Sequence, residues 1–558
     1  MTASPEARPR VHDRAHPRTA PSSAVGTGPA GRQRLSAWPR RLVPALVLAL
    51  VAGVVVGLTF PPELGSLVPV PPLLAYVVAI VSVAGYLRVL ADRTLRTGLL
   101  LGLVFGVGLL GVAVRWLSVI GSIATVPLVL FEALFFALAG LGLTCALRLR
   151  GWVVWTPAVW VLGEGIRSRV PFGGFAWVRL GYLGVDTPFA GWAKIGAVPL
   201  TSFLLVLLAA ALLAVVLTLR RHRQPHRERQ RAPGKSWRPV AALAVLVFAL
   251  AAGGTLMPAF THTVGHSTVA IVQGSVPGKG LQFLGRARTV TRNHLQATAR
   301  LAAEVDAGTL PAPAFVIWPE NSTDIDPLTD TETAADIDAA VAEAGVPILV
   351  GAVFDGPGPR QVRNVGLVWN PGTGPGDFYV KRHLVPFGEY VPLRSLLTPI
   401  VPMLNEFIPL DMVAGTKSGA LDIAGVRIGD MLCFDTAYDG AARADVVDGA
   451  QLLIVQTNNA TYTGTGQPDQ QWQITRFDAL AFGRTTAVAS TNGRSGVIAA
   501  DGTSIATLPV IEQGYLSLSM PLRTGHTPAV WLAGWLELVL ATVGGLAILA
   551  GVLRRRRV

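Results

Sequence analysis

Eight apolar stretches, each close to the length that crosses a lipid bilayer, constrain this chain more than any other feature. A helix that spans a bilayer needs about 20 predominantly apolar residues. The stretches lie at 42–58, 73–91, 98–117, 126–147, 151–166, 198–219, 239–257 and 530–553. We do not expect the first to be a signal peptide, because 41 residues precede it and six more apolar runs follow it before residue 258. The sequence therefore predicts an integral membrane protein with a bundle of eight transmembrane helices.

Basic residues concentrate beside these apolar stretches. Residues 1–41 carry eight Arg against two acids, residues 220–238 carry eight Lys or Arg against one acid, and residues 554–557 are all Arg. Cytoplasmic flanks are enriched in Lys and Arg, so eight spans place both termini in the cytoplasm and residues 258–529 outside. Residues 258–528 carry 17 basic and 25 acidic residues, which argues against a nucleic-acid-binding domain.

The chain is predicted to divide into five parts. In order, these are a disordered basic cytoplasmic tail at 1–41, seven transmembrane helices at 42–257, an extracytoplasmic domain at 258–529, the eighth helix at 530–553 and a second basic tail at 554–558. Within 265–525, short β-branched runs alternate with helical stretches, which predicts a single α/β domain.

A strand candidate at 314–318 leads into Pro319 and Glu320. Catalytic groups of α/β folds gather at strand ends, where loops project them into a cleft. Partial burial against Trp318 and Pro319 suits the Glu320 carboxylate for general-base work. An ordinary solvated loop carboxylate is the alternative that this segment leaves open.

The run 379–392 embeds charged residues among aromatic residues, Pro and Gly. Lys381 is a candidate for stabilising an oxyanion, and Glu389 is a candidate for orienting that lysine. The alternative is a surface strand with a Lys–Glu ion pair, which contributes little stability. No second His or Cys stands at metal-ligand spacing from His383, so we expect a structural histidine and no metal site.

Cys433 is the third candidate. The other cysteine, Cys145, lies in the apolar stretch 126–147, so the two do not pair and Cys433 is a free thiol. Cys433 lies between a strand candidate at 425–432 and a helix candidate at 436–448, and a helix N-terminus lowers the pKa of a thiol. This position favours a nucleophile, and a small buried residue is the alternative.

A carboxylate, a lysine and a thiol together form a usable catalytic set. The carboxylate takes the thiol proton, the thiolate attacks a carbonyl carbon, and the lysine stabilises the tetrahedral oxyanion. An acyl thioester forms and passes to a second acceptor. Glu320, Lys381 and Cys433 are 61 and 52 residues apart, so only folding can bring them together.

This set resembles that of the carbon–nitrogen hydrolase (nitrilase) superfamily over residues 265–525. With seven spans before the domain and one after it, the whole chain resembles the bacterial apolipoprotein N-acyltransferases. The strings that carry the resemblance are Val272-Gln273-Gly274, Trp318-Pro319-Glu320, the run from Lys381 to Pro392, Cys433 with its flanks, and Thr457-Asn458-Asn459-Ala460.

The resemblance implies a four-layered αββα fold for the outer domain. It implies Glu320 as general base, Lys381 as the oxyanion-stabilising residue and Cys433 as the acyl-accepting nucleophile, with Glu389 as a supporting acid. The implied reaction moves a fatty acyl chain from a phospholipid to Cys433. The chain then moves to the α-amino group of the diacylglyceryl-cysteine of an apolipoprotein.

The same resemblance implies a multi-pass protein of the bacterial cytoplasmic membrane that works on two lipid partners. We expect a monomer. No nucleotide fingerprint or phosphate-binding Gly loop is present, so we expect no cofactor.

Several further residues are candidates for contact with lipid substrates. Phe175 and Trp177 lie in an outer loop that resembles the family's aromatic loop near the substrate entry, and an interfacial aromatic belt is the alternative. Asn458 is a candidate through its motif. Glu132 and Glu164 lie inside apolar stretches, where ionisable residues are either functional or join spans by hydrogen bonds.

Two strings depart from the family pattern. Many members carry Cys-Tyr-Glu where this chain has Cys433-Phe434-Asp435, so the supporting acid, Asp435, is one methylene shorter. The family commonly has Asn-Asp-Ala-Trp where this chain has Asn458-Asn459-Ala460-Thr461, so a carboxylate and an aromatic ring are absent.

Two other functions compete with acyl transfer. A membrane-anchored amidase would use the same residues with water as acceptor, although eight spans exceed what an anchor needs. A transporter or sensor with an inactive outer domain would need an internal repeat, and no convincing repeat is evident.

Overall fold

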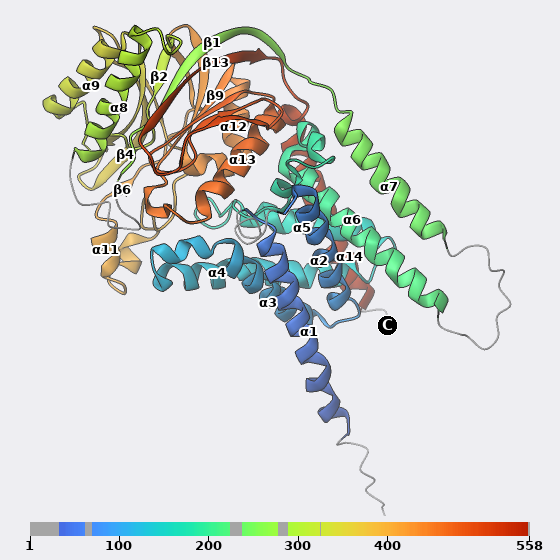
Figure 1. Cartoon of the computed structure of the whole chain (residues 1–558). Coiled ribbons are helices and arrows are strands. Elements are labelled where there is room, and N and C mark those ends of the chain that lie inside the picture. The colour runs from blue at the N-terminus through green and yellow to red at the C-terminus, as the bar shows by residue number, and fades with distance from the viewer. Residues whose placement is uncertain (1–32, 62–69, 224–236, 277–287, 324, 556–558) are drawn as a thin grey trace, which may run out of the picture. The chain divides into compact units, whose positions relative to one another are not determined.

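The computed structural model describes residues 33–61, 70–223, 237–276, 288–323 and 325–555 (Figure 1). The described part of the chain contains a group of apolar helices and an α/β domain. The domain is inserted in sequence between the seventh and the last of these helices. The predicted tails at 1–41 and 554–558 lie largely outside the described residues.

Eight helices of the described chain coincide with the eight apolar stretches. They are α1 (Gln33–Leu58), α2 (Pro72–Leu90), α3 (Leu95–Ala113), α4 (Ser122–Ala146), α5 (Trp152–Arg167), α6 (Ala193–Arg223), α7 (Arg238–Thr255) and α14 (Ala529–Arg555). Among the described residues, six helices are long and apolar enough to cross a bilayer. The apolar part of α1, Leu42–Leu58, falls short of that length, and α5 has 16 residues. The count of eight spans therefore stays a prediction.

Small residues allow these helices to pack closely. A Cβ atom on Gly102 of α3 would lie 2.2 Å from the backbone oxygen of Phe136 in α4. A Cβ atom on Gly140 of α4 would lie 2.5 Å from the backbone oxygen of Gly98 in α3. Close backbone approach through small residues is how membrane helices gain packing energy without a hydrophobic driving force.

Where α3 ends, the chain departs from the predicted apolar stretch 98–117. The α-helix stops at Ala113, and Arg115–Val119 forms a 3-10 turn, η1. A second 3-10 turn, η2 (Leu180–Gly184), lies between α5 and α6. Both turns contact the α/β domain, as described below.

The α/β domain is built on two sheets. The first has the order β13-β1-β2-β3-β4-β5, with β6 paired to β4, and the second has the order β12-β11-β10-β9-β8-β7. The strands of the first sheet are β1 (His262–Gln273), β2 (Phe315–Ile317), β3 (Ile348–Asp355), β4 (Gln361–Asn370), β5 (Gly374–Val380), β6 (Asp411–Met412) and β13 (Gly514–Thr524). Those of the second are β7 (Ala420–Ile423), β8 (Val426–Leu432), β9 (Leu452–Thr457), β10 (Thr486–Ser490), β11 (Gly496–Ile498) and β12 (Ser504–Thr507).

Helices cover the outer faces of both sheets (Figure 1). The first sheet packs against α8 (Thr289–Asp306) and α9 (Thr331–Ala344), and the second against α12 (Asp439–Val447) and α13 (Gln467–Phe482). A separate cluster of buried apolar residues fills the space between the sheets, including Val269, Ile317 and Ile454. This arrangement confirms the αββα fold. Two short helices, α10 (Arg394–Leu397) and α11 (Met403–Phe407), follow β5.

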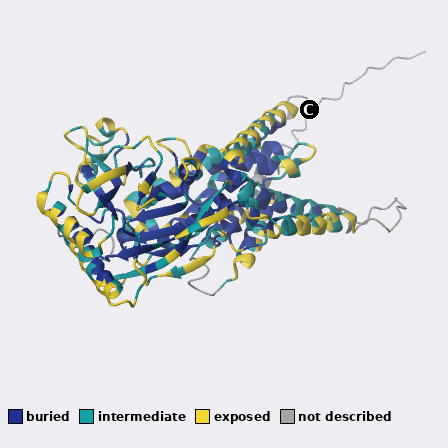
Figure 2. Ribbon diagram, turned by 90° about the horizontal axis from the view of Figure 1, so that it is seen from above, coloured by how far each residue is buried: buried dark blue, intermediate teal, exposed yellow. Residues whose placement is uncertain are grey.

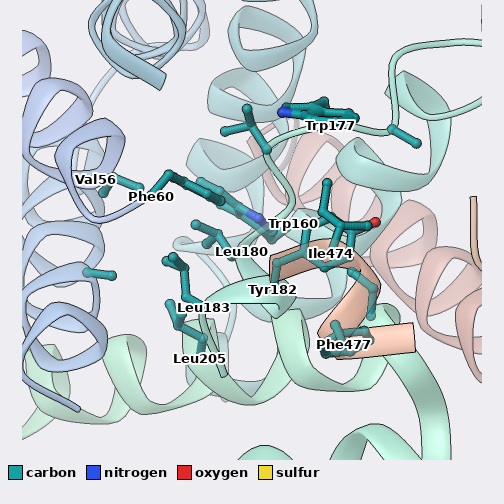
Figure 3. Close-up of a cluster of buried hydrophobic side chains, with 14 of the residues drawn as sticks. Val56, Phe60, Trp160, Trp177, Leu180, Tyr182, Leu183, Leu205, Ile474 and Phe477 are labelled. Atoms are coloured by element: carbon teal, nitrogen blue, oxygen red, sulfur yellow. The ribbon is translucent and has the colours of Figure 1, made fainter. Parts of the chain in front are cut away.

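One continuous apolar cluster joins the membrane helices to α12 and α13. Figure 3 shows part of it, where Tyr182 of η2 lies beside Ile474 and Phe477 of α13, and Val56 and Leu205 lie farther away in the same cluster. Elsewhere the apolar helices expose large side chains, such as Phe248 and Trp535, whereas the strands are largely buried (Figure 2). Exposed apolar surface of this kind is what lipid would cover.

Candidate active site

Three strand ends bring the candidate catalytic residues to one edge of the sandwich. Glu320 follows β2, Lys381 directly follows β5, and Cys433 directly follows β8. Asn458 comes directly after β9, the neighbour of β8 in the second sheet. The sequence-based prediction that folding brings these segments together is therefore consistent with the topology.

Lys381 lies between two carboxylates. Its Nζ donates hydrogen bonds to Glu320 Oε1 at 2.9 Å and to Glu389 Oε1 at 2.6 Å, and its side chain is only 1% exposed. Burial opposes the charge, but the carboxylates of Glu320 and Glu389 raise the pKa of Lys381 well above its ordinary value. The lysine is therefore a fixed cation, not a base.

Further hydrogen bonds hold the Glu320 carboxylate. Asn364 of β4 donates from Nδ2 to Oε1 at 2.7 Å, and the backbone N–H of Asn458 donates to Oε2 at 2.9 Å. These hydrogen bonds thus fix the orientation of both carboxylate oxygens of Glu320. Sequence reasoning missed Asn364, which stands in the middle of a strand without a motif around it.

Glu389 is attached to the same lysine from the other side. Its Oε2 accepts a hydrogen bond from the backbone N–H of Val385 at 2.8 Å. Burial raises the pKa of Glu389, and the nearby charge of Glu320 adds to this, while Lys381 opposes both. The structure thus places the Glu389 carboxylate against Lys381, on the other side from Glu320.

Cys433 begins a tight turn. Its φ is 48°, the left-handed region that costs a non-glycine residue about 1–3 kcal/mol and is often found at functional sites. Residues Cys433–Ala437 form a 3-10 turn, not the first turn of an α-helix, and α12 begins only at Asp439. The strand β8 therefore ends before the partly buried Cys433, which belongs to the turn.

The expectation of a low thiol pKa is wrong for this state of the site. Burial raises the pKa of the Cys433 thiol to about 12, and the charge of Glu320 adds to the rise against the opposing charge of Lys381. Desolvation of the thiolate outweighs the favourable effect expected from a helix N-terminus. The thiol is therefore protonated at neutral pH and needs a base when it reacts.

Asp435 stabilises the turn that carries Cys433. Its Oδ2 accepts from Tyr379 Oη at 2.8 Å and from the backbone N–H of Leu432 at 3.1 Å. Its Oδ1 accepts from the backbone N–H and from Nδ1 of His383, at 2.9 and 2.8 Å. Burial opposes the charge, but the hydrogen bonds from His383 hold the pKa of Asp435 below its ordinary value.

The contacts of His383 are with protein groups that support the turn: it binds Asp435 through its ring and its backbone N–H. Its ring stacks on Tyr438 with centroids 4.1 Å apart. Among the residues that the structure describes, no three His, Cys, Asp or Glu side chains lie together in a way that could hold a metal ion.

Aromatic side chains from the membrane half pack against the residue that follows Cys433. The rings of Phe175 and Trp177 stack on Phe434, the residue after Cys433, at centroid distances of 6.2 and 6.0 Å. Trp116 of η1 lies 6.0 Å from Trp177 and 5.0 Å from Tyr462. We call Trp116, Phe175, Trp177, Phe434 and Tyr462 the aromatic wall. Sequence reasoning found Phe175 and Trp177 through their loop, but it missed Trp116 and Tyr462.

The side chain of Asn458 forms a hydrogen bond within its own turn. Its Oδ1 accepts from the backbone N–H of Ala460 at 3.2 Å, while its own N–H orients Glu320. Next to it, Asn459 Oδ1 accepts from Thr457 Oγ1 at 2.8 Å. Asn459, which replaces the family's carboxylate in this string, thus forms a hydrogen bond within the local turn.

The acids inside the apolar helices have structural partners. Glu132 of α4 lies 3.6 Å from Arg167 of α5. Arg167 also donates to the backbone oxygens of Phe175 at 2.9 Å and Trp177 at 2.6 Å. Glu164 accepts from Trp160 Nε1 at 2.9 Å and from the backbone N–H of Leu180 at 3.0 Å. These contacts support the structural alternative for both acids.

Comparison with known proteins places both halves of the chain. Residues 52–211 match the family described as "Apolipoprotein N-acyltransferase N-terminal domain", and residues 268–524 match the family described as "Carbon-nitrogen hydrolase". Among solved structures, an amidase from Nesterenkonia sp. AN1, with acetamide covalently added at its active-site cysteine, is 17% identical. It covers 46% of this chain and 91% of its own, with a TM-score of 0.34.

Full-length relatives are also found. A protein from Mycolicibacterium smegmatis, named "Apolipoprotein N-acyltransferase", is 34% identical over 100% of this chain and 93% of its own length. A protein of the same name from Methylococcus capsulatus is 30% identical over 92% of this chain and 97% of its own. The chain belongs to the apolipoprotein N-acyltransferase family.

Proposed function

We propose that this protein transfers a fatty acyl chain from a membrane phospholipid to the N-terminal α-amino group of an apolipoprotein's diacylglyceryl-cysteine, through a thioester on Cys433. One observation carries the residue assignment. A buried lysine shared by two carboxylates, Glu320 and Glu389, lies within electrostatic reach of the Cys433 thiol, and an aromatic ring of the membrane half stacks on the next residue, Phe434.

The first half-reaction forms the thioester. Glu320 takes the proton of Cys433, and the sulfur attacks the carbonyl carbon of the phospholipid ester. The Lys381 ammonium stabilises the negative oxygen of the tetrahedral intermediate. When the intermediate collapses, the ester C–O bond breaks, the lysophospholipid oxygen takes the proton back from Glu320, and the acyl chain stays on sulfur.

The second half-reaction returns the enzyme to its starting state. The α-amino nitrogen of the acceptor attacks the thioester carbonyl, and Glu320 takes a proton from that nitrogen. Collapse of the second tetrahedral intermediate breaks the C–S bond. The Cys433 thiolate receives the proton from Glu320, and the acceptor leaves as an amide.

The resting thiol fits this sequence of steps. Because burial raises its pKa to about 12, Cys433 does not persist as an exposed nucleophile that reacts with any electrophile. Proton transfer to Glu320 occurs together with attack on a bound ester. Lys381 also opposes the rise in thiol pKa, so the same cation that favours the thiolate favours the oxyanion.

The predicted topology completes the proposal. Eight spans leave the α/β domain outside the cytoplasmic membrane of a bacterium, both termini inside, and the chain as a monomer. The aromatic wall then lies where α3 and α5 end, so that a lipid acyl chain can reach the thiol without crossing open water. A membrane-anchored amidase would use the same catalytic residues, but the hydrolysis of a small amide would not require such an aromatic wall.

Intact mass spectrometry of the detergent-purified protein tests this function. After incubation with phospholipid, the wild-type protein should gain the mass of one fatty acyl group, and hydroxylamine should remove it. Cys433→Ala should gain nothing. Cys145→Ala is the matched control, because Cys145 is the second cysteine and is buried in α4, and it should behave as the wild type.

A diacylated lipopeptide is added in the second stage. The enzyme should lose its acyl group, and the lipopeptide should gain the same mass. If the wild-type enzyme acquires no acyl group and the lipopeptide stays diacylated, the proposed function is wrong.

A further inference from the structure

The side-chain carboxamide of Gln470, near the start of α13, joins three segments of the chain. Its Oε1 accepts hydrogen bonds from Trp116 Nε1 at 3.0 Å and from Trp177 Nε1 at 2.8 Å. Its Nε2 donates to the backbone oxygen of Ala113 at 2.8 Å. The residue is only 3% exposed. One buried side chain of the α/β domain thus binds the end of α3, the turn η1 and the loop after α5.

These three hydrogen bonds need a carboxamide. A buried indole N–H requires an acceptor, and Trp116 and Trp177 present two such donors to one oxygen. Ala113 is the last residue of α3, so its carbonyl has no partner within the helix and requires a donor. A carboxylate cannot donate and an ammonium cannot accept, so Gln470 satisfies all three groups at once.

The next residue of α13 holds the nucleophile. Gln471 Nε2 donates to the backbone oxygen of Cys433 at 3.2 Å, and Gln471 Oε1 lies 3.1 Å from Thr457 Oγ1. Neighbouring side chains of one helix therefore fix the two indoles and the residue that carries the thiol. The distance between the wall and the thiol is set by α13, not by the loops alone.

The stacking geometry links the indoles to the reacting atoms. The Trp177 ring lies 6.0 Å from the Phe434 ring with an interplanar angle of 16°, and Phe434 follows Cys433 in the chain. Trp116 meets Trp177 at 6.0 Å and 62°. A change in either indole would alter the apolar surface beside the thiol.

We infer that Gln470 is a positioning residue that holds Trp116 and Trp177 against the donor's acyl chain and thereby sets which chain lengths the enzyme accepts. This rests on the proposed function. An acyl chain gains free energy with each methylene that it buries. When the aromatic wall is held in one position, acyl chains that fill the space beside it gain the most binding free energy. When the wall moves, long and short chains gain more similar binding free energies.

The test compares Gln470→Met with Gln473→Met. Gln473 lies on the same helix and donates one hydrogen bond to the membrane half, from Nε2 to the backbone oxygen of Tyr182 at 3.0 Å, but it does not contact the aromatic wall. For each protein, kcat/KM of thioester formation is measured with dipalmitoyl and with dioctanoyl phospholipid. We expect Gln470→Met to bring the ratio of the dipalmitoyl value to the dioctanoyl value about tenfold closer to one, and Gln473→Met to leave it unchanged.

Two further variants keep the inference testable if Gln470→Met fails to fold. Trp116→Phe and Trp177→Phe each retain an aromatic ring and remove one N–H donor, so each should shift the chain-length ratio in the direction expected for Gln470→Met. A change in overall rate with an unchanged ratio would show a merely structural role and would overturn the inference.

The outcomes separate this inference from the function on which it rests. If the wild-type enzyme forms no thioester, the proposed function is wrong. If the wild-type enzyme forms the thioester and the variants of Gln470, Trp116 and Trp177 that fold keep its chain-length ratio, only the role of Gln470 is wrong.

Discussion

Lys381 Nζ lies 2.9 Å from Glu320 Oε1, in a space where both side chains are almost fully buried. Glu389 shares the same ammonium group, so one cation balances two carboxylates. Removing one partner of a buried ion pair is far more costly than the pair itself is stabilising, because it leaves a charge without compensation. The charge of Lys381 therefore affects both the stability of the folded protein and the proposed reaction.

We expect Lys381→Met to abolish acyl transfer and to lower the free energy of unfolding by about 3–5 kcal/mol, since two buried carboxylates would lose their cation. Thermal unfolding in detergent measures the second effect. Lys417→Met, which changes an exposed lysine of the same domain, is the control and should leave both properties unchanged. A Lys381→Met protein as stable as the wild type would contradict the ion-pair account.

The thiol pKa predicts opposite effects for two substitutions. Glu320 raises the pKa of Cys433 and Lys381 lowers it. In Glu320→Gln the thiol pKa should therefore fall from about 12, the thiolate fraction at a given pH should rise, and alkylation by iodoacetamide should become faster. Acyl transfer should nevertheless be lost, because the base is absent. In Lys381→Met alkylation should become slower.

Rates of alkylation between pH 7 and pH 10, measured in a Cys145→Ala background, decide this point. For the wild type, the rate should still be rising at the upper end of this range. A plateau below about pH 9, where an ordinary thiol is half ionised, would contradict the assignment of a buried and protonated thiol.

Much of the site could be predicted because Glu320 and Cys433 each follow an apolar strand. The runs before these two residues read as strand ends, and such ends meet at one edge of a sandwich. Lys381 follows the largely exposed strand β5, so only its charged segment and the resemblance indicate its place. The αββα fold followed from the resemblance, and alternating strands and helices agreed with it.

What could not be predicted depends on contacts between distant segments. Asn364 binds Glu320 from the interior of β4, and Trp116 lies in a 3-10 turn that reads as part of an apolar stretch. The expected lowering of the thiol pKa is wrong because Cys433 lies in a 3-10 turn, and the predicted helix after β8 begins only at Asp439, as α12. Burial by surrounding elements dominates.

Asp435 should tolerate no neutral replacement. A backbone N–H points at each of its oxygens, from Leu432 at Oδ2 and from His383 at Oδ1. The amide of Asp435→Asn would therefore face one of these donors with its own NH2 group, whichever way it is turned. We expect a loss of about 2–3 kcal/mol in the free energy of unfolding, and slower thioester formation because the Cys433 turn loosens.

The pH dependence of this loss has a definite sign. The folded pKa of Asp435 is lowered, so its contribution is fully present above the unfolded value of about 3.9 and disappears as the pH falls through the folded value. Unfolding of the wild type and Asp435→Asn at pH 7 and pH 3 tests this. The difference between the two proteins should be smaller at pH 3, and an equal difference would contradict the prediction.

The Glu132–Arg167 pair should respond asymmetrically to substitution. Arg167→Met leaves the buried Glu132 carboxylate without its cation, and it also releases the backbone oxygens of Phe175 and Trp177. We expect a loss of stability of about 3–5 kcal/mol and a loss of acyl transfer. Glu132→Gln leaves Arg167 bound to those carbonyl groups, so its effect on both measurements should be clearly smaller. Equal losses in the two variants would contradict this account.

The eight-span topology predicts which loops a reagent outside the cell can reach. Thr94 lies exposed between α2 and α3, and Ser118 lies exposed between α3 and α4, so the prediction places them on opposite sides of the membrane. In a chain with Cys145→Ala and Cys433→Ala, a membrane-impermeant maleimide should label Ser118→Cys in cells or spheroplasts with an intact inner membrane. It should label Thr94→Cys only after that membrane is permeabilised. Labelling of Thr94→Cys from outside would show that the number of spans before α3 is not two and would reverse the predicted sides of the first loops.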